Sequence, residues 1–142
     1  DRENHRIQVF NDEGALITTW DDLERPDDII IVDDQYMFVA ELLHRVSIWT
    51  LDGTLLTHWG DAQASNDAGL FISPHAIAVD SRGVLYVGEV CDTNGRYDRG
   101  SRAIQKFIDG DLEYEETRKT RPNLVGKRPV RTTRTPRHQI RA

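Results

Sequence analysis

The stretch that decides the fold is SPHAIAVDSRGVLYVGE, residues 73–89. Ile77 and Val79 alternate with two alanines, which is the two-residue period of a half-buried strand. Residues 80–83 (DSRG) have the composition of a tight turn, and residues 84–87 are β-branched, aromatic or aliphatic. Pro74 precedes the first strand, where its missing N–H costs little. The stretch therefore predicts a two-stranded hairpin, with His75 at the mouth of its first strand.

The same order of signals occurs earlier in the chain. Residues 26–33 (PDDIIIVD) run into residues 36–41 (YMFVAE). The leading proline and the closing glutamate of this stretch both recur 48 residues later, in the deciding stretch. Asp33 recurs as Asp80, one residue short of that spacing. The two stretches are therefore predicted to be equivalent strand pairs.

A second motif recurs at a different spacing. Its two copies share a histidine, a turn glycine and a closing tryptophan, each 39 residues apart: NHRIQVF (4–10) with Gly14 and Trp20, and HRVSIW (44–49) with Gly53 and Trp59. Residues 102–107 (RAIQKF) form a third copy. A period near 40 residues with strand signals alone predicts the blades of a β-propeller.

We therefore predict an all-β fold, a β-propeller segment of about two and a half blades. Residues 1–117 supply a partial blade at 1–20, a full blade at 25–59 and a last blade at 71–116. Propellers close with about four to eight blades, and an incomplete one leaves open sheet edges. We expect the chain to be part of a longer propeller whose missing blades cover these edges, or to be covered by another chain.

The composition is that of a soluble globular protein. Hydrophobic residues make up 38% and charged residues 30% of the 142 residues, and no apolar run is long enough to span a membrane. Cys91 is the only cysteine, which excludes an internal disulfide and a cysteine-rich zinc site.

The charge is divided unevenly along the chain. Residues 118–142 contain nine Lys or Arg and no acid, which leaves nine basic residues against all 24 acidic residues in the rest. The segment also has few large apolar residues, so we predict a disordered basic tail that does not pack against the blades. We expect no nucleic-acid partner beyond non-specific contacts of this tail.

The motifs quoted above resemble those of NHL-repeat β-propellers over residues 1–116. Residues 4–10 resemble the third strand of an NHL blade, and residues 74–80 resemble the first. Within that group the chain is most similar to peptidyl-α-hydroxyglycine α-amidating lyase. Residues 1–8 (DRENHRIQ) resemble the DRENxRIQ segment of that family, and residues 71–75 (FISPH) resemble the FxxPH segment of its last blade.

This resemblance implies a six-bladed zinc enzyme that cleaves C-terminal α-hydroxyglycine from peptides, leaving a peptide amide and glyoxylate. Such an enzyme would be secreted or periplasmic. His75 matches one of three zinc-binding histidines, and Arg2 matches an active-site arginine that contacts the substrate carboxylate. Ala76 stands where the family has a calcium-binding aspartate, which puts calcium in doubt. Ser73 stands where the family has a methionine.

Each assignment has an alternative. Neutral imidazole suits Zn²⁺, but a Pro-His pair before a strand can equally be structural. Arg2 either binds a carboxylate through two parallel N–H donors or forms a salt bridge with Glu3 or another acid. The protein is either part of a lyase-like enzyme, with a peptide or small-molecule substrate at the channel mouth, or a non-catalytic propeller that binds a protein, a peptide or a polymer.

Other polar residues are expected to hold the blades together. Glu41 and Glu89 end equivalent strands, so we expect each to hold the next loop by accepting backbone N–H groups, rather than to act as paired catalytic carboxylates. His5 and His44 follow the repeat and are predicted at blade edges. Tyr97 belongs to an insertion at 90–100 that either borders a ligand site or is a surface loop.

Overall fold

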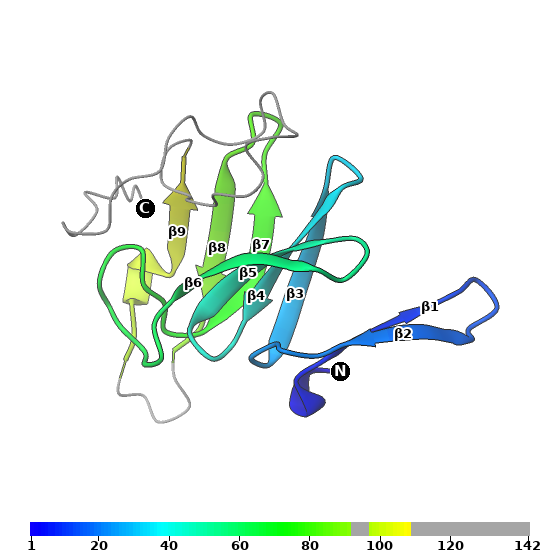
Figure 1. Cartoon of the computed structure of the whole chain (residues 1–142). Coiled ribbons are helices and arrows are strands. Elements are labelled where there is room, and N and C mark those ends of the chain that lie inside the picture. Colours follow the sequence, from blue (N-terminus) through cyan, green and yellow to red (C-terminus); the bar gives the residue numbers. More distant parts are fainter. Residues whose placement is uncertain (92–96, 109–142) are drawn as a thin grey trace.

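The computed structural model describes residues 1–91 and 97–108, and its regular structure is β apart from two single-turn 3-10 helices at Arg2–Asn4 and Gly100–Arg102. The strands form three antiparallel sheets (Figure 1). The first sheet holds β1 (Ile7–Phe10) and β2 (Leu16–Trp20); the second holds β3 (Pro26–Val32), β4 (Tyr36–Glu41), β5 (Arg45–Thr50) and β6 (Leu55–Gly60); the third holds β7 (Pro74–Val79), β8 (Leu85–Glu89) and β9 (Ile104–Phe107). The prediction of an all-β fold is confirmed. No helix within the described residues is long and apolar enough to cross a membrane.

The predicted strand pairs at 26–41 and 74–89 are equivalent. Pro26 lies opposite Glu41 and Pro74 lies opposite Glu89, and the register then shifts at the same place in both pairs. In β7 the side chain of Ile77 is buried, which agrees with the alternation in the sequence. The sequence spacing of 48 residues therefore corresponds to one structural unit.

Three hairpins share one turn geometry, which the repeat predicted for the hairpins of Gly14 and Gly53. The N–H groups of Gly14, Gly53 and Gly83 donate to the carbonyl oxygens three residues earlier, at 2.9, 3.1 and 2.9 Å. All three glycines have positive φ angles of 81°, 91° and 79°, which residues with a Cβ rarely adopt. In each hairpin the side chain of the turn's first residue accepts the N–H four residues on: Asn11, Thr50 and Asp80.

The structure corrects one detail of the repeat and confirms another. The turn between β3 and β4 starts at Val32, whose carbonyl accepts the N–H of Gln35, so Asp80 is equivalent to Val32 rather than to Asp33. In the third copy, Gln105 lies opposite Val87 as Ser47 lies opposite Val39. The copy at 102–107 is therefore in register with residues 44–49, as the sequence predicts.

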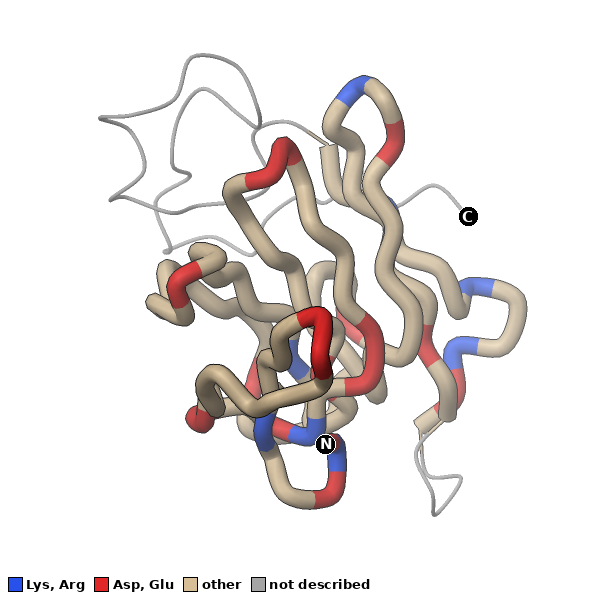
Figure 2. The backbone as a smooth tube through the Cα atoms, turned by 90° about the vertical axis from the view of Figure 1, so that its right-hand side faces the viewer, with Lys and Arg blue, Asp and Glu red and all other residues tan. Residues whose placement is uncertain are grey.

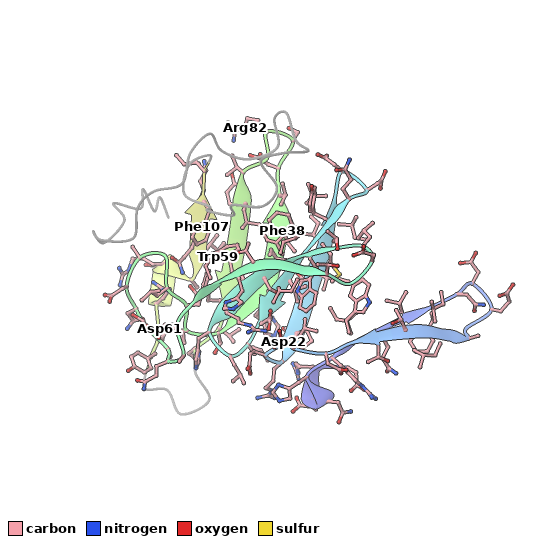
Figure 3. All side chains as sticks on the ribbon, viewed as in Figure 1. Asp22, Phe38, Trp59, Asp61, Arg82 and Phe107 are labelled. Atoms are coloured by element: carbon pink, nitrogen blue, oxygen red, sulfur yellow. The ribbon has the colours of Figure 1, made fainter. Side chains whose placement is uncertain are left out.

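The second sheet packs on both faces. One core cluster fills the space between it and the third sheet, where Figure 3 labels Phe38, Trp59 and Phe107. A second cluster lies on its other face, where Met37, Val39 and Trp49 meet Ile7 and Trp20 of the first sheet. Because side chains alternate along β4, adjacent residues serve the two clusters, and every residue of this strand is buried.

Neighbouring sheets are joined by the same kind of aromatic contact. Trp20 at the end of β2 stacks on Trp49, with ring centroids 6.4 Å apart. Trp59 at the end of β6 meets Phe107, the residue equivalent to Trp49, edge-on at 5.8 Å. Each such pair buries a large apolar surface between sheets.

Candidate functional site

Two buried glutamates fix the loops at one end of the sheets. Glu41 accepts the N–H of Glu24, and Glu89 accepts the N–H of Ile72 at 2.6 Å, exactly one 48-residue unit later. Each also accepts a hydrogen bond from its own sheet, from Ser47 in one case and from Gln105 at 2.6 Å in the other. The prediction that these acids accept backbone N–H groups is confirmed, but the loop that each one holds leads into its sheet rather than following its strand.

The two repeat histidines join the same loops. His5 and His44 both have left-handed backbones, with φ of 56° and 71°. The Nδ1 atom of His5 lies 3.3 Å from the carbonyl oxygen of Leu23, and Nδ1 of His44 contacts the carbonyl oxygen of Ile72. Both histidines thus contact the chain segment that leads into the next sheet.

A pocket of about 690 Å³ opens at this end of the molecule. It lies where strands begin and end, so its wall comes from many separate segments. The lining residues are Arg2, Arg25, Leu42, Leu43, His44, Ala62, Gln63, Ala64, Ser73, His75, Val90, Cys91 and Tyr97. Both residues singled out by the resemblance, Arg2 and His75, therefore lie on one pocket, together with Tyr97 of the insertion.

Asp27 connects the two. Its Oδ1 accepts a hydrogen bond from Nη1 of Arg2 at 2.7 Å, and its Oδ2 lies 3.0 Å from Nε2 of His75. The Asp27 side chain is nearly buried, whereas about half of the His75 side chain is exposed to the pocket. Arg2 also donates through Nε to Glu3 at 3.1 Å, so the salt bridges considered for Arg2 are present.

The charges beside the pocket are paired. Figure 2 shows basic and acidic residues close together on the backbone beside the N-terminus. The hydrogen bond to Asp27 and then that to Glu3 raise the pKa of Arg2, which keeps the guanidinium charged. The hydrogen bond from Arg25, at 2.6 Å, and then that from Arg2 lower the pKa of Glu3. The Nε atom of Arg25 is buried and has no hydrogen-bond partner among the described residues.

The described residues do not by themselves fit a zinc site. A catalytic zinc needs three protein ligands, and within residues 1–91 and 97–108 no group of three His, Cys, Asp or Glu side chains is arranged to hold a metal. In addition, Nε2 of His75 already faces Asp27. Among the described residues His75 thus contacts Asp27 at the pocket wall, and the zinc role that the resemblance implies stays a prediction.

The insertion supplies a buried residue that the sequence did not reveal. The Arg99 side chain is almost fully buried, and its Nε lies 2.6 Å from Oε1 of Glu89. Its terminal nitrogens donate to carbonyl oxygens of the loop before β7, including Asn66 at 2.9 Å and Ser65 at 3.0 Å. Arg99 thereby fixes that loop, which also forms part of the pocket wall. Residues 92–96 of the insertion lie outside the described residues.

Sequence reasoning also missed Asp27, although a signal for it existed. Asp27 and His75 are 48 residues apart and each follows the proline that opens an equivalent strand. Because β3 and β7 lie side by side, equivalent positions at their mouths come into contact. The 48-residue spacing alone therefore pointed to a contact between these two residues.

The comparisons with known proteins support the fold and give no function. No protein family matches the chain, and no curated protein matches it. Among solved structures, it is similar to a protein of unknown function from Bacteroides caccae, with a TM-score of 0.58 and 15% identity. The match covers 75% of this chain and 39% of that one, so the chain spans well under half of its length. At this identity the likeness is one of fold alone.

Proposed function

We propose that the chain is a segment of an NHL-type β-propeller whose pocket binds the carboxylate group of a peptide or small molecule. The observation that carries the proposal is the charge of the pocket wall. Among its described lining residues are two arginines, Arg2 and Arg25, and two histidines, but no acid.

The propeller is supported by the way in which the sheets recur. One core cluster joins the second sheet to the third, and another joins the second sheet to the first. Three contacts recur: a glutamate that accepts a loop N–H, a histidine that contacts a loop carbonyl, and an aromatic pair between sheets. When each sheet contacts the next one in the same way and enough sheets are present, the sheets form a propeller.

A carboxylate is the ligand that these donors suit best. Guanidinium groups bind carboxylates through paired N–H donors, and Nε of Arg25 has no hydrogen-bond partner among the described residues. The pocket volume of about 690 Å³ lies within the usual range for small-molecule sites, about 300–1,000 Å³. Because Asp27 and Glu3 hold the Arg2 guanidinium in place, little side-chain entropy is lost when a ligand binds.

Calorimetric titration with a short peptide that has a free C-terminal carboxylate, and with the same peptide amidated, tests this proposal. The free carboxylate should bind at least tenfold more tightly, about 1.4 kcal/mol. Arg25→Gln should remove most of that difference. Arg82→Gln is the matched control, because Arg82 lies at the opposite end of the sheets (Figure 3). Equal binding of the two peptides would contradict the proposal.

Catalysis by an amidating-lyase-like mechanism is a second candidate. What favours it is that Arg2 and His75, the residues that the resemblance assigns, meet through Asp27 on one pocket. In that family, zinc supplies the Lewis acid. The test is glyoxylate release from a peptidyl-α-hydroxyglycine. Release above the spontaneous rate that His75→Ala abolishes would support the enzyme, and its absence together with tight carboxylate binding would leave the binding role.

A further inference from the structure

We propose that the free edge of β1 binds an antiparallel β-hairpin, and that the hairpin strand beside β1 ends in a glutamate. In the second sheet, β5 lies between β4 and β6. Its counterpart β1 pairs with β2 alone among the described strands, so one of its edges is unpaired. This inference does not depend on what the pocket binds.

The side chains at β1 indicate that the strand that pairs with it ends in a glutamate. In the second sheet Glu41 accepts hydrogen bonds from Ser47 and, at 2.8 Å, from Nε of Arg45. Gln8 on β1 and Arg6 just before β1 stand 39 residues before Ser47 and Arg45. In the third sheet the position of Gln8 is again a glutamine, Gln105, and it donates to Glu89 at 2.6 Å.

Neither donor on β1 has such a glutamate here. The Gln8 side-chain amide makes no hydrogen bond within the described part of the chain. Arg6 turns to Asp1, at 2.7 Å, near the molecular surface. A carboxylate at the end of a neighbouring strand would accept from both, as Glu41 accepts from both of its partners.

The same hairpin would also cover two exposed isoleucines on β3. Ile77 on β7 is only 8% exposed because β3 and β4 pack against it, and its N–H donates to Asp28 at 2.9 Å. The equivalent residue on β3, Ile29, is 48% exposed, and Ile31 is 53% exposed. Figure 1 shows β3 at the side of the packed body that faces the β1–β2 hairpin. A hairpin that extends β1 would meet β3 as β3–β4 meets β7.

The chain contains its own template for this partner. Residues 25–42 contain the hairpin that completes the second sheet, and the required glutamate, Glu41, is their penultimate residue. A labelled synthetic peptide of this sequence is therefore the probe, and fluorescence anisotropy with the full chain measures its affinity. The peptide should bind, and its Glu41→Gln form should bind at least tenfold more weakly.

Variants of the chain locate the binding surface. Arg6→Gln combined with Gln8→Ala, and separately Ile29→Ser combined with Ile31→Ser, should each weaken binding tenfold or more without lowering the thermal midpoint, because these side chains are at least partly exposed. Ile104→Ser is the matched control, since Ile104 is equally exposed but lies on β9. Absence of binding would overturn the inference, as would binding that these variants leave unchanged. A dimer formed through β1 that the peptide does not dissociate would overturn it too.

Discussion

The first sheet and the β5–β6 half of the second sheet share a sequence pattern but not an environment. Both halves have the histidine, the turn glycine and the closing tryptophan at a spacing of 39 residues, and both form a hairpin with the same turn. Trp49 on β5 is 3% exposed, however, whereas Phe10 at the equivalent place on β1 is 52% exposed. The pattern thus decides the strand and the turn, and the neighbouring strands decide the burial.

The effect of a substitution on the free energy of unfolding should depend on the environment of the residue rather than on its place in the repeat. The second sheet has a complete set of buried contacts, so a substitution there leaves polar groups without partners. In the first sheet the corresponding groups are already solvated or paired at the surface. Equivalent substitutions in the two sheets should therefore differ in cost, and matched pairs of variants measure that difference.

The largest difference is expected for Glu41→Ala in the second sheet against Gln8→Ala in the first, where Gln8 occupies the place of Ser47, a donor to Glu41. Removing the Glu41 carboxylate leaves the Arg45 guanidinium, the Ser47 hydroxyl and the Glu24 N–H without their acceptor, in a buried setting. Loss of one partner of a buried ion pair costs about 3–5 kcal/mol of unfolding free energy. Gln8→Ala should stay within about 0.5 kcal/mol of wild type. Urea denaturation monitored by tryptophan fluorescence gives both values, and a small effect of Glu41→Ala would refute the comparison.

A smaller difference is expected between the two turn glycines. Alanine at either position must adopt a positive φ, which costs about 1–2 kcal/mol. At Gly53 the added Cβ would also lie 2.4 Å from Nε1 of Trp20, whereas at Gly14 nothing lies within 4 Å. Gly53→Ala must displace Trp20 from its stack on Trp49 and should cost about 1–3 kcal/mol more. Similar unfolding midpoints for the two variants would show that Trp20 moves freely.

Much of the fold could be predicted because its signals are local or periodic. Alternation and turn residues predicted the strands, and the 48-residue spacing predicted that Glu41 and Glu89 have one role. That role follows from position: a carboxylate at the end of an inner strand lies beside the N–H groups of the loop that leads into its sheet. The predictions for the blade region after residue 108 and for the tail at 118–142 lie outside the described residues.

The site was less predictable because its contacts join residues with no common local pattern. Arg99 reaches Glu89 from an insertion without a counterpart in the second sheet, so no repeat could indicate its burial. Arg2 reaches Asp27 across 25 residues, and an arginine near many acids gives no hint of its partner. Only the contact between Asp27 and His75 carried a signal, since both follow the same repeated proline.

The smallest expected effect compares the acid response of two equivalent turns. Asp80 opens the turn of the third sheet, where a hydrogen bond from Arg82 and then backbone N–H groups lower its pKa from 3.8 to about 2. A lowered folded-state pKa contributes stability above the unfolded value, and this contribution is lost as the pH falls from about 4 to about 2. Asn11 opens the equivalent turn of the first sheet and makes the same hydrogen bond without titrating.

Asp80→Asn should therefore make the third-sheet turn resemble the first-sheet turn. The difference in urea midpoint between wild type and Asp80→Asn should be largest at pH 5 and should shrink by pH 2.5, because only the wild type loses a charge interaction over that range. Arg82→Gln is the second arm, and it should shift the loss to higher pH by removing the main cause of the lowered pKa. A difference between wild type and Asp80→Asn that stays constant from pH 5 to pH 2.5 would mean that Asp80 acts in this turn as Asn11 does, as a hydrogen-bond acceptor whose charge adds nothing.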